Sequence, residues 1–321
     1  MSCSVSTRFS VGMLAAFAAI YFFWGTTYLA IAVAIREIPP FISGTSRFLL
    51  AALVMYVWVR WRDPRPMANV DLKMAALTGV LLSGVGNGLV VWAQQGIASG
   101  IAALIVTAVP VIVLLLDWAF FSKRAPTRQA LIGTTIAVAG VVAIVTHTRS
   151  LSGEANPLYV VALLLATVGW SFGTLVQKRT VQPGTVLSFT CAQMLFGGLF
   201  QLGMSFVDRE WATFDPSAVT WSSLAAVAYL IVFGSIVGLN CYLWLLTRVA
   251  APKVATYALV NPVVALLLGS LVLNEQLTAL AVSAAALVLA GVSLVLFQDM
   301  PRPSRLMAYV ARRLPAFARG E

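Results

Sequence analysis

Ten apolar runs divide this chain, each close to the 20 or so residues that a helix needs to cross a bilayer. They cover residues 11–35, 41–59, 73–93, 97–121, 128–146, 158–176, 185–207, 220–246, 254–273 and 277–297. Only 10% of the 321 residues are charged and 60% are hydrophobic, whereas a soluble domain has about 25% charged residues. Such a chain cannot cover itself with polar surface. We therefore expect a polytopic membrane protein.

The composition of the runs selects helices over strands. Ala, Gly, Leu and Val dominate them, and no ten-residue segments of alternating polarity appear. A membrane β-barrel needs that alternation, because its strands face lipid and lumen in turn. The sequence therefore predicts an all-α bundle of ten transmembrane helices.

One stretch of the chain occurs twice at a constant offset of 152 residues. Ser83–Leu116 and Ser235–Leu268 align without a gap and are identical at 11 of 34 positions. The identities include Gly86 with Gly238, Trp92 with Trp244, and Pro110 with Pro262. A fixed-offset match of this kind indicates an internal duplication. We expect a first five-helix repeat at 11–147 and a second at 158–298.

The basic residues predict the orientation of the two repeats. With the N-terminus in the cytoplasm, 17 Lys and Arg residues lie inside and only Arg36, Arg149 and Arg209 lie outside. Lys and Arg are retained on the cytoplasmic side, so both termini should be cytoplasmic. Because each repeat has an odd number of spans, the second must be inverted relative to the first. The basic tail at 299–321 could lie on the anionic membrane lipids as an amphipathic helix, or be a disordered tail.

Several function classes are disfavoured by what the chain contains. The net charge of +10 comes from residues in short loops, not from one basic face, which argues against nucleic-acid binding. The cysteines, Cys3, Cys191 and Cys241, have no metal-ligand spacing. The only histidine, His147, has no catalytic partners at matching depth and is expected to be interfacial. We predict no enzyme activity, no metal and no cofactor.

Two charged residues lie well inside predicted spans and are candidates for gating. Arg47 is about six residues from the outer end of the second span, and Asp117 is similarly close to the inner end of the fourth. Charges in lipid are costly and so are functional candidates by default. The alternative for Arg47 is snorkelling to the surface. For Asp117 it is simple proximity to the basic loop at Lys123.

Polar, aromatic and proline residues near mid-membrane depth predict a solute cavity. Pro110 and Pro262 each remove a backbone hydrogen bond and should kink the fourth and ninth spans. Trp24 is too deep for the interfacial aromatic belt, and Tyr257 lies one helical turn before Asn261. The predicted cavity residues are Trp24, Tyr28, Asn87, Trp170, Asn240, Tyr257 and Asn261. The glycines of Gly84-x-x-x-Gly88 and Gly234-x-x-x-Gly238 are assigned to close helix packing.

These segments together resemble the drug/metabolite transporter superfamily, EamA type, over about residues 12–298. The resemblance rests on WGTTYLAI at 24–31, RFLLAA at 47–52, AQQGIASGIAALIVTAVP at 93–110, and FGSIVGLNCYLWLLTRVAAPKVATYALVNPVVALLLG at 233–269. It implies a ten-helix, inverted-repeat exporter of the prokaryotic inner membrane. Two departures matter. The acidic residue common after the fourth helix is absent, and Gln94-Gln95 replaces a Glu-His pair of some relatives.

We therefore expect a secondary transporter of small organic metabolites, amino acids or related compounds, working by alternating access. Efflux follows from the resemblance alone. The alternatives are a broad exporter of hydrophobic drugs, which the same aromatic walls would serve, and an intramembrane enzyme. A coupling proton is a possible partner, but relatives' acidic residues cannot supply its site here. Substrate, direction, coupling ion and oligomeric state stay open.

Overall fold

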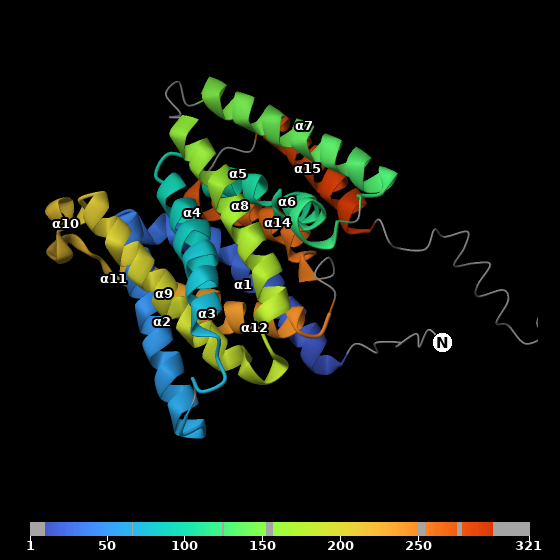
Figure 1. The fold of residues 1–321 in the computed structure, drawn as a ribbon. Helices are drawn as coiled ribbons and strands as arrows, with labels where there is room; N and C mark the ends of the chain where they lie inside the picture. Colours follow the sequence, from blue (N-terminus) through green and yellow to red (C-terminus); the bar gives the residue numbers. More distant parts are fainter. Residues whose placement is uncertain are drawn as a thin grey trace, which may run out of the picture.

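The computed structural model describes residues 10–65, 67–123, 125–151, 157–249, 254–274 and 278–297 (Figure 1). Every regular element in these ranges is a helix, which agrees with the predicted all-α class. Helices suit apolar sequence in a bilayer because each one satisfies its own backbone polar groups. The predicted tail at 299–321 lies outside the described residues.

The first half contains the helices that match the first five predicted spans. They are α1 (Val11–Ala34), α2 (Pro40–Arg62), α3 (Leu72–Thr78), η1 (Gly79–Gly86), α4 (Asn87–Ala93), α5 (Ser99–Val106), α6 (Val109–Leu116), η2 (Asp117–Ser122) and α7 (Arg128–Leu151). The local sequence explains where two of these helices begin. The Ser10 hydroxyl accepts a hydrogen bond from the Met13 amide, and Asp71 accepts from the amides of Lys73 and Met74. Such side chains satisfy the free amides at a helix N-terminus.

The second half follows the same order of long and divided helices. It contains α8 (Pro157–Thr180), η3 (Pro183–Thr185), α9 (Val186–Val207), α10 (Glu210–Thr213), η4 (Pro216–Ala218), α11 (Trp221–Tyr229), η5 (Leu230–Val237), α12 (Gly238–Leu246), α14 (Tyr257–Leu273) and α15 (Ala279–Leu296). The segments η1 and η5 are π-helical, and at the 152-residue offset η1 aligns with 231–238, one residue from η5. A π-helix holds an extra residue per turn and is often found at functional sites.

Seven helices or continuous helical runs in the described residues are long and apolar enough to cross a membrane. They are Val11–Ala34, Pro40–Arg62, Leu72–Ala93, Ser99–Ser122, Pro157–Thr180, Pro183–Val207 and Trp221–Leu246. Shorter apolar helices occupy Arg128–Ala143, Tyr257–Leu273 and Val282–Val295, where three further spans are predicted. The structure thus confirms the all-α class and, among the described residues, seven segments with the length and composition of membrane spans.

The main helix contacts join one half of the chain to the other. Helix α2 packs along α9, and α7 packs along α15 (Figure 1). Helix α1 packs against α11, η5, α12 and α14 of the second half. Its counterpart α8 packs against α3, η1, α4, α5 and α6 of the first half. The two halves therefore bury their apolar faces against each other.

Glycines allow a close contact between α7 and α15. A Cβ added to Gly291 would lie 2.4 Å from the Ala137 amide nitrogen and 2.5 Å from the Gly133 carbonyl oxygen. A Cβ on Gly133 would in turn lie 2.6 Å from the Gly291 carbonyl oxygen. Because no side chain fits there, the two backbones can approach closely, as in other small-residue membrane interfaces.

Candidate transport cavity

A small internal cavity lies where helices of both halves meet. It encloses about 70 Å³, enough for a few water molecules or a small chemical group. Residues from α1, α2, η1, α4 and α5 of the first half and from α8, η5, α12 and α14 of the second form its walls. Six of the predicted cavity residues line it: Trp24, Tyr28, Asn87, Trp170, Tyr257 and Asn261.

Aromatic rings make up one wall of the cavity. The Trp24 ring centroid lies 5.5 Å from that of Trp170 and 5.0 Å from that of Tyr257, both in edge-to-face geometry. Tyr242 does not line the cavity, but its ring centroid lies 5.1 Å from that of Trp24 and its hydroxyl lies 2.8 Å from the Thr174 hydroxyl. Sequence reasoning missed Tyr242. The signal was present, because Tyr242 replaces Val90 of the first copy just as Tyr257 replaces Ile105.

The position of Trp24 depends on two glycines of the second half. Its indole nitrogen donates a hydrogen bond to the Gly234 carbonyl oxygen in η5 at 3.1 Å. A Cβ on Gly238 would lie only 2.2 Å from the same indole nitrogen. Gly234 and Gly238, which the sequence assigned to helix packing, therefore do allow a close approach. The group that approaches them is the Trp24 side chain, which lines the cavity.

Arg47 does not snorkel to the surface. It is only 3% exposed and lines the cavity from α2. Its Nε atom donates to the Ser235 hydroxyl at 2.7 Å, and Nη1 donates to the Asn87 side-chain oxygen at 2.9 Å. Ser235, which was not predicted as a site residue, is the repeat partner of Ser83. Arg47 thus connects α2 to both η5 and α4.

The Asn261 amide joins α1 to α14. In the orientation that satisfies its neighbours, its nitrogen donates to the backbone oxygens of Tyr257 and Tyr21 at 3.2 and 3.1 Å. The Tyr21 hydroxyl also lies 2.5 Å from the Thr256 hydroxyl, at the break just before α14. Asn261 therefore holds the aromatic wall together as well as lining the cavity.

The structure does not bring Asn240 to this set. Its side-chain nitrogen donates to the Ile236 carbonyl oxygen at 2.6 Å. Asn240 lines a separate, more open groove of about 750 Å³ instead, together with Trp244 and Arg248. The prediction that Asn240 belongs to the central cavity is therefore corrected by its position on α12.

Only one of the two prolines, Pro110, lies beside a helix break. Pro110 is the second residue of α6 and follows the break at Thr107–Ala108 between α5 and α6. Pro262 lies inside α14, and the break in this span comes earlier, at Ala255–Thr256. Neither proline is a cavity-lining residue. Both divided spans nevertheless contribute lining residues next to the break, Val106 in α5 and Tyr257 in α14.

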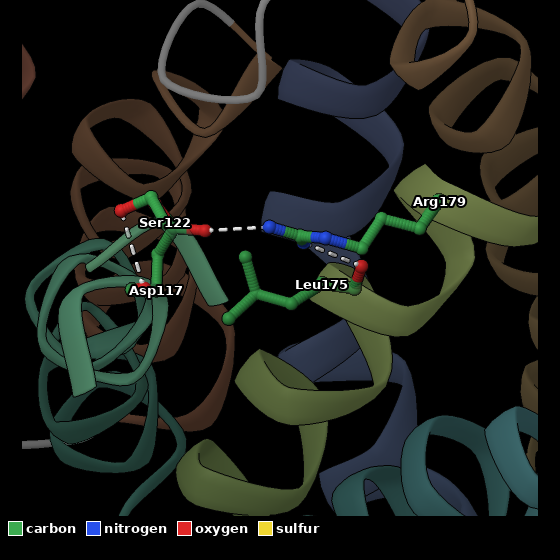
Figure 2. A network of polar contacts seen from close by, with 4 residues as sticks. All are labelled: Asp117, Ser122, Leu175 and Arg179. Carbon is green, nitrogen blue, oxygen red and sulfur yellow. Dashed lines mark hydrogen bonds and ion pairs between the residues drawn. The ribbon is translucent and has the colours of Figure 1, made fainter. Parts of the chain in front are cut away.

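Asp117 lies away from the cavity and pairs with α8. Figure 2 shows its carboxylate facing the Arg179 guanidinium, with Asp117 Oδ1 3.0 Å from Arg179 Nη2. Arg179 Nη1 also donates to the Leu175 carbonyl oxygen at 3.1 Å, and its guanidinium lies 4.2 Å from the Phe121 ring centroid. The Asp117 side chain is 34% exposed and the Arg179 side chain is 44% exposed. This is a partly exposed contact between η2 and α8, at the predicted cytoplasmic side.

Two carboxylates join helices at the opposite end of the bundle. Glu210 accepts hydrogen bonds from the Phe41 and Ile42 amides at 2.9 and 2.8 Å, and so caps α2. Burial raises the pKa of Glu210, although these amides act against that rise. Glu37 accepts from the Thr220 amide at 2.7 Å, and this bond chiefly lowers the pKa of Glu37. Both carboxylates tie loops that follow one helix to the start of another.

The cavity offers reversible binding groups: a guanidinium, amides, hydroxyls and aromatic faces. Within the described residues, no three His, Cys, Asp or Glu side chains come close enough to hold a metal ion. The side chain of His147 lies outside the described residues.

Comparison with known proteins identifies the family. The model of the EamA-like transporter family matches residues 10–146 and 157–297. The chain belongs to this family. The two matched EamA regions correspond to the two halves of the fold, so the EamA domain is duplicated. The two relatives described next are named as a transporter and an efflux pump.

Two curated EamA-type relatives cover most of the chain. An uncharacterized inner membrane transporter of Escherichia coli K12, YedA, is 34% identical over 289 residues, which is 88% of this chain and 92% of YedA. A probable amino-acid metabolite efflux pump of Salmonella typhimurium is 26% identical and covers 85% of this chain and 91% of the pump. A protein of known crystal structure shares the fold with a TM-score of 0.63 and 18% identity, covering 90% of this chain and 98% of its own.

Proposed function

We propose that this chain is a secondary transporter that exports small organic metabolites, amino acids or related compounds, across a prokaryotic inner membrane. One observation carries the proposal. Six side chains singled out from the sequence, from α1, α4, α8 and α14, line one buried cavity between the two halves. A cavity at the interface of two repeats is where transporters of this kind bind their solute. The name of the Salmonella relative supports the metabolite class and the direction.

The proposed mechanism is alternating access between two inverted five-helix repeats, 11–147 and 158–298, with ten spans in all. The reciprocal packing supports it, since α1 contacts the divided helices of the second half and α8 contacts those of the first. The π-helical segments η1 and η5, at nearly equivalent positions, support it as well. In this mechanism, the breaks at Thr107–Ala108 and Ala255–Thr256 allow the helix segments on either side to move separately.

The proposed orientation places both termini in the cytoplasm, as the distribution of Lys and Arg predicts. Asp117 and Arg179 then lie at the cytoplasmic end, where their contact would close α8 against η2 in one state and open in the other. Cysteines introduced at Arg62 and Asp208 test this orientation. The two should react with impermeant reagents from opposite sides, and reaction from the same side would refute the orientation.

Flux into liposomes tests the transport function. Purified protein should move amino acids or related metabolites faster than empty vesicles do, and a pH gradient should change the rate if a proton is coupled. The aromatic wall of Trp24, Trp170 and Tyr257 also suits flat hydrophobic drugs, so the panel should include them. Drug flux without metabolite flux would favour the broad drug exporter. No flux of any compound would refute the transporter, and conversion of a compound would favour an enzyme.

A further inference from the structure

Arg47 has more hydrogen-bond donors than the protein around it has acceptors. A guanidinium carries five N–H groups. Two of them donate, to Ser235 and Asn87, so three have no acceptor among the described residues. Within those residues no carboxylate lies within ion-pair distance of Arg47. The side chain is nevertheless 3% exposed and lines the cavity.

Burying a charge without a counter-ion costs on the order of several kcal/mol in a protein. The two neutral acceptors and the Phe48 ring, whose centroid lies 4.8 Å from the guanidinium carbon, provide only part of what water would. Gly234 admits the guanidinium to this position, because a Cβ there would lie 2.9 Å from Arg47 Nη2. This arrangement fits a cation whose partner enters the cavity and leaves again.

We propose that Arg47 binds the carboxylate of the transported solute, so that the substrates are small monocarboxylates. This inference rests on the proposed transport function and names its substrate class. One N–H of Nη1 and both of Nη2 remain for the solute, and a guanidinium can hold one carboxylate with two parallel hydrogen bonds. Ser235 and Asn87 act as positioning residues that fix the plane of the guanidinium.

The rest of the cavity limits the solute to a single negative charge. Arg47 is the only charged residue among the described residues that line it. A dicarboxylate or a phosphate monoester would bring a second negative charge with no second cation to balance it. The rings of Trp24, Trp170 and Tyr257 suit an apolar group, and their faces also attract a cation such as an ammonium group. Amino acids and simple aliphatic acids both meet these requirements.

Matched pairs of solutes test the proposal in proteoliposomes. The first pair is L-leucine and L-leucinamide; the second, without an ammonium group, is 4-methylvalerate and its amide. Wild-type protein should move at least one carboxylate about tenfold faster than its amide, the ratio expected for losing one charge-assisted pair. Arg47→Gln should abolish that preference, Arg47→Lys should retain part of it, and Arg62→Gln on the exposed end of α2 should leave it unchanged. Equal rates for acid and amide, or a preference that survives in Arg47→Gln, would overturn the proposal.

A binding measurement covers the case in which Arg47→Gln does not fold. Thermal unfolding of the wild-type protein in detergent is compared in sodium 4-methylvalerate, its amide, sodium sulfate and sodium chloride at equal ionic strength. Stabilisation by the carboxylate alone supports the proposal, and equal stabilisation by chloride or sulfate refutes it. Flux of amines or neutral drugs, with none of either acid, would refute the substrate class and leave the transport function standing. No flux of any compound would refute both.

Discussion

The indole nitrogen of Trp24 lies 3.1 Å from the backbone oxygen of Gly234, and this bond links α1 to the π-helical segment η5. Trp24→Phe keeps an aromatic side chain, though a smaller one, and removes the donor, which leaves the Gly234 carbonyl without its indole partner. We expect a loss of stability of about 1–3 kcal/mol and reduced solute flux. Thermal unfolding and liposome flux measure the two effects. Trp61→Phe, at an 86% exposed position of α2, is the control and should change neither.

The two asparagines Asn261 and Asn240 should respond differently to substitution by alanine. Asn261 lines the central cavity and bonds to α1, whereas Asn240 lines a different groove and bonds within its own helix. Asn261→Ala and Tyr257→Ala should lower flux by roughly five- to tenfold, the equivalent of one hydrogen bond. Asn240→Ala should keep near wild-type flux. If the two asparagine variants transport equally well, the central cavity is not the solute site.

The positions of Asn87 and Asn240 show what the sequence could not predict: Asn87 lines the central cavity and Asn240 does not. At the 152-residue offset Asn240 aligns with Gly88 and not with Asn87. One residue turns a helix by about 100°, so Asn240 faces another side of its span. The π-helical segments η1 and η5 lie just before these asparagines and alter the helical phase further. Apolar runs and turn residues indicate where helices lie, but not this rotation.

The partners of Arg47 were unpredictable for a related reason. Ser235 lies 188 residues away in the chain, and only the packing of α2 against η5 brings its hydroxyl to Nε. By contrast, the helical class, the duplicated EamA region and the six cavity residues Trp24, Tyr28, Asn87, Trp170, Tyr257 and Asn261 could be predicted. The six residues could be predicted because they are polar or aromatic and lie deep within apolar runs, and the duplication could be predicted because the two copies align at a constant offset.

Glu210 and Glu37 should give opposite pH dependences of stability. Burial raises the pKa of Glu210 above its ordinary value of 4.5. The contribution of Glu210 to the free energy of unfolding is therefore fully present below pH 4.5 and is lost as pH rises through the raised pKa. The Thr220 amide lowers the pKa of Glu37, so its contribution is present above pH 4.5 and is lost as pH falls through the lowered pKa.

Thermal unfolding of Glu210→Gln and Glu37→Gln from pH 3.5 to pH 7 measures these slopes, within the stability range of the protein in detergent. Glu210→Gln should lack the loss of stability with rising pH, and Glu37→Gln should lack the loss of stability with falling pH. A wild-type slope that both variants retain would show that other groups determine it.

The contact between Asp117 and Arg179 should contribute little to stability. Both side chains are partly exposed, and exposed ion pairs are worth about 0–1 kcal/mol. A double-mutant cycle with Asp117→Ala and Arg179→Ala should therefore give a coupling energy below about 1 kcal/mol, and less at high salt. If the pair closes the bundle in one transport state, the flux of the single variants should change more than their stability. Unchanged flux in both would exclude that role.

The close approach of α7 and α15 gives a sharp stability test. Gly291→Ala puts a methyl group 2.4 Å from the Ala137 nitrogen, so the helices must separate. We expect a loss of about 1–3 kcal/mol, as for other overpacked positions. Gly184→Ala is the matched control, because a Cβ there meets nothing within 4 Å. Unfolding temperatures of the two variants should differ clearly, and equal values would contradict the packing seen between the helices.

The reciprocal packing of the two halves also has a consequence for biosynthesis. The main partners of α1, α2 and α7 are α14, α9 and α15, all of which the ribosome makes after the first half. The contacts of the first half are therefore completed stepwise: α2 can pack against α9 once residue 207 is made, but α7 gains its partner only when translation has passed residue 296. A chain divided between residues 151 and 157 should assemble when both fragments are made together, and either fragment made alone should be degraded.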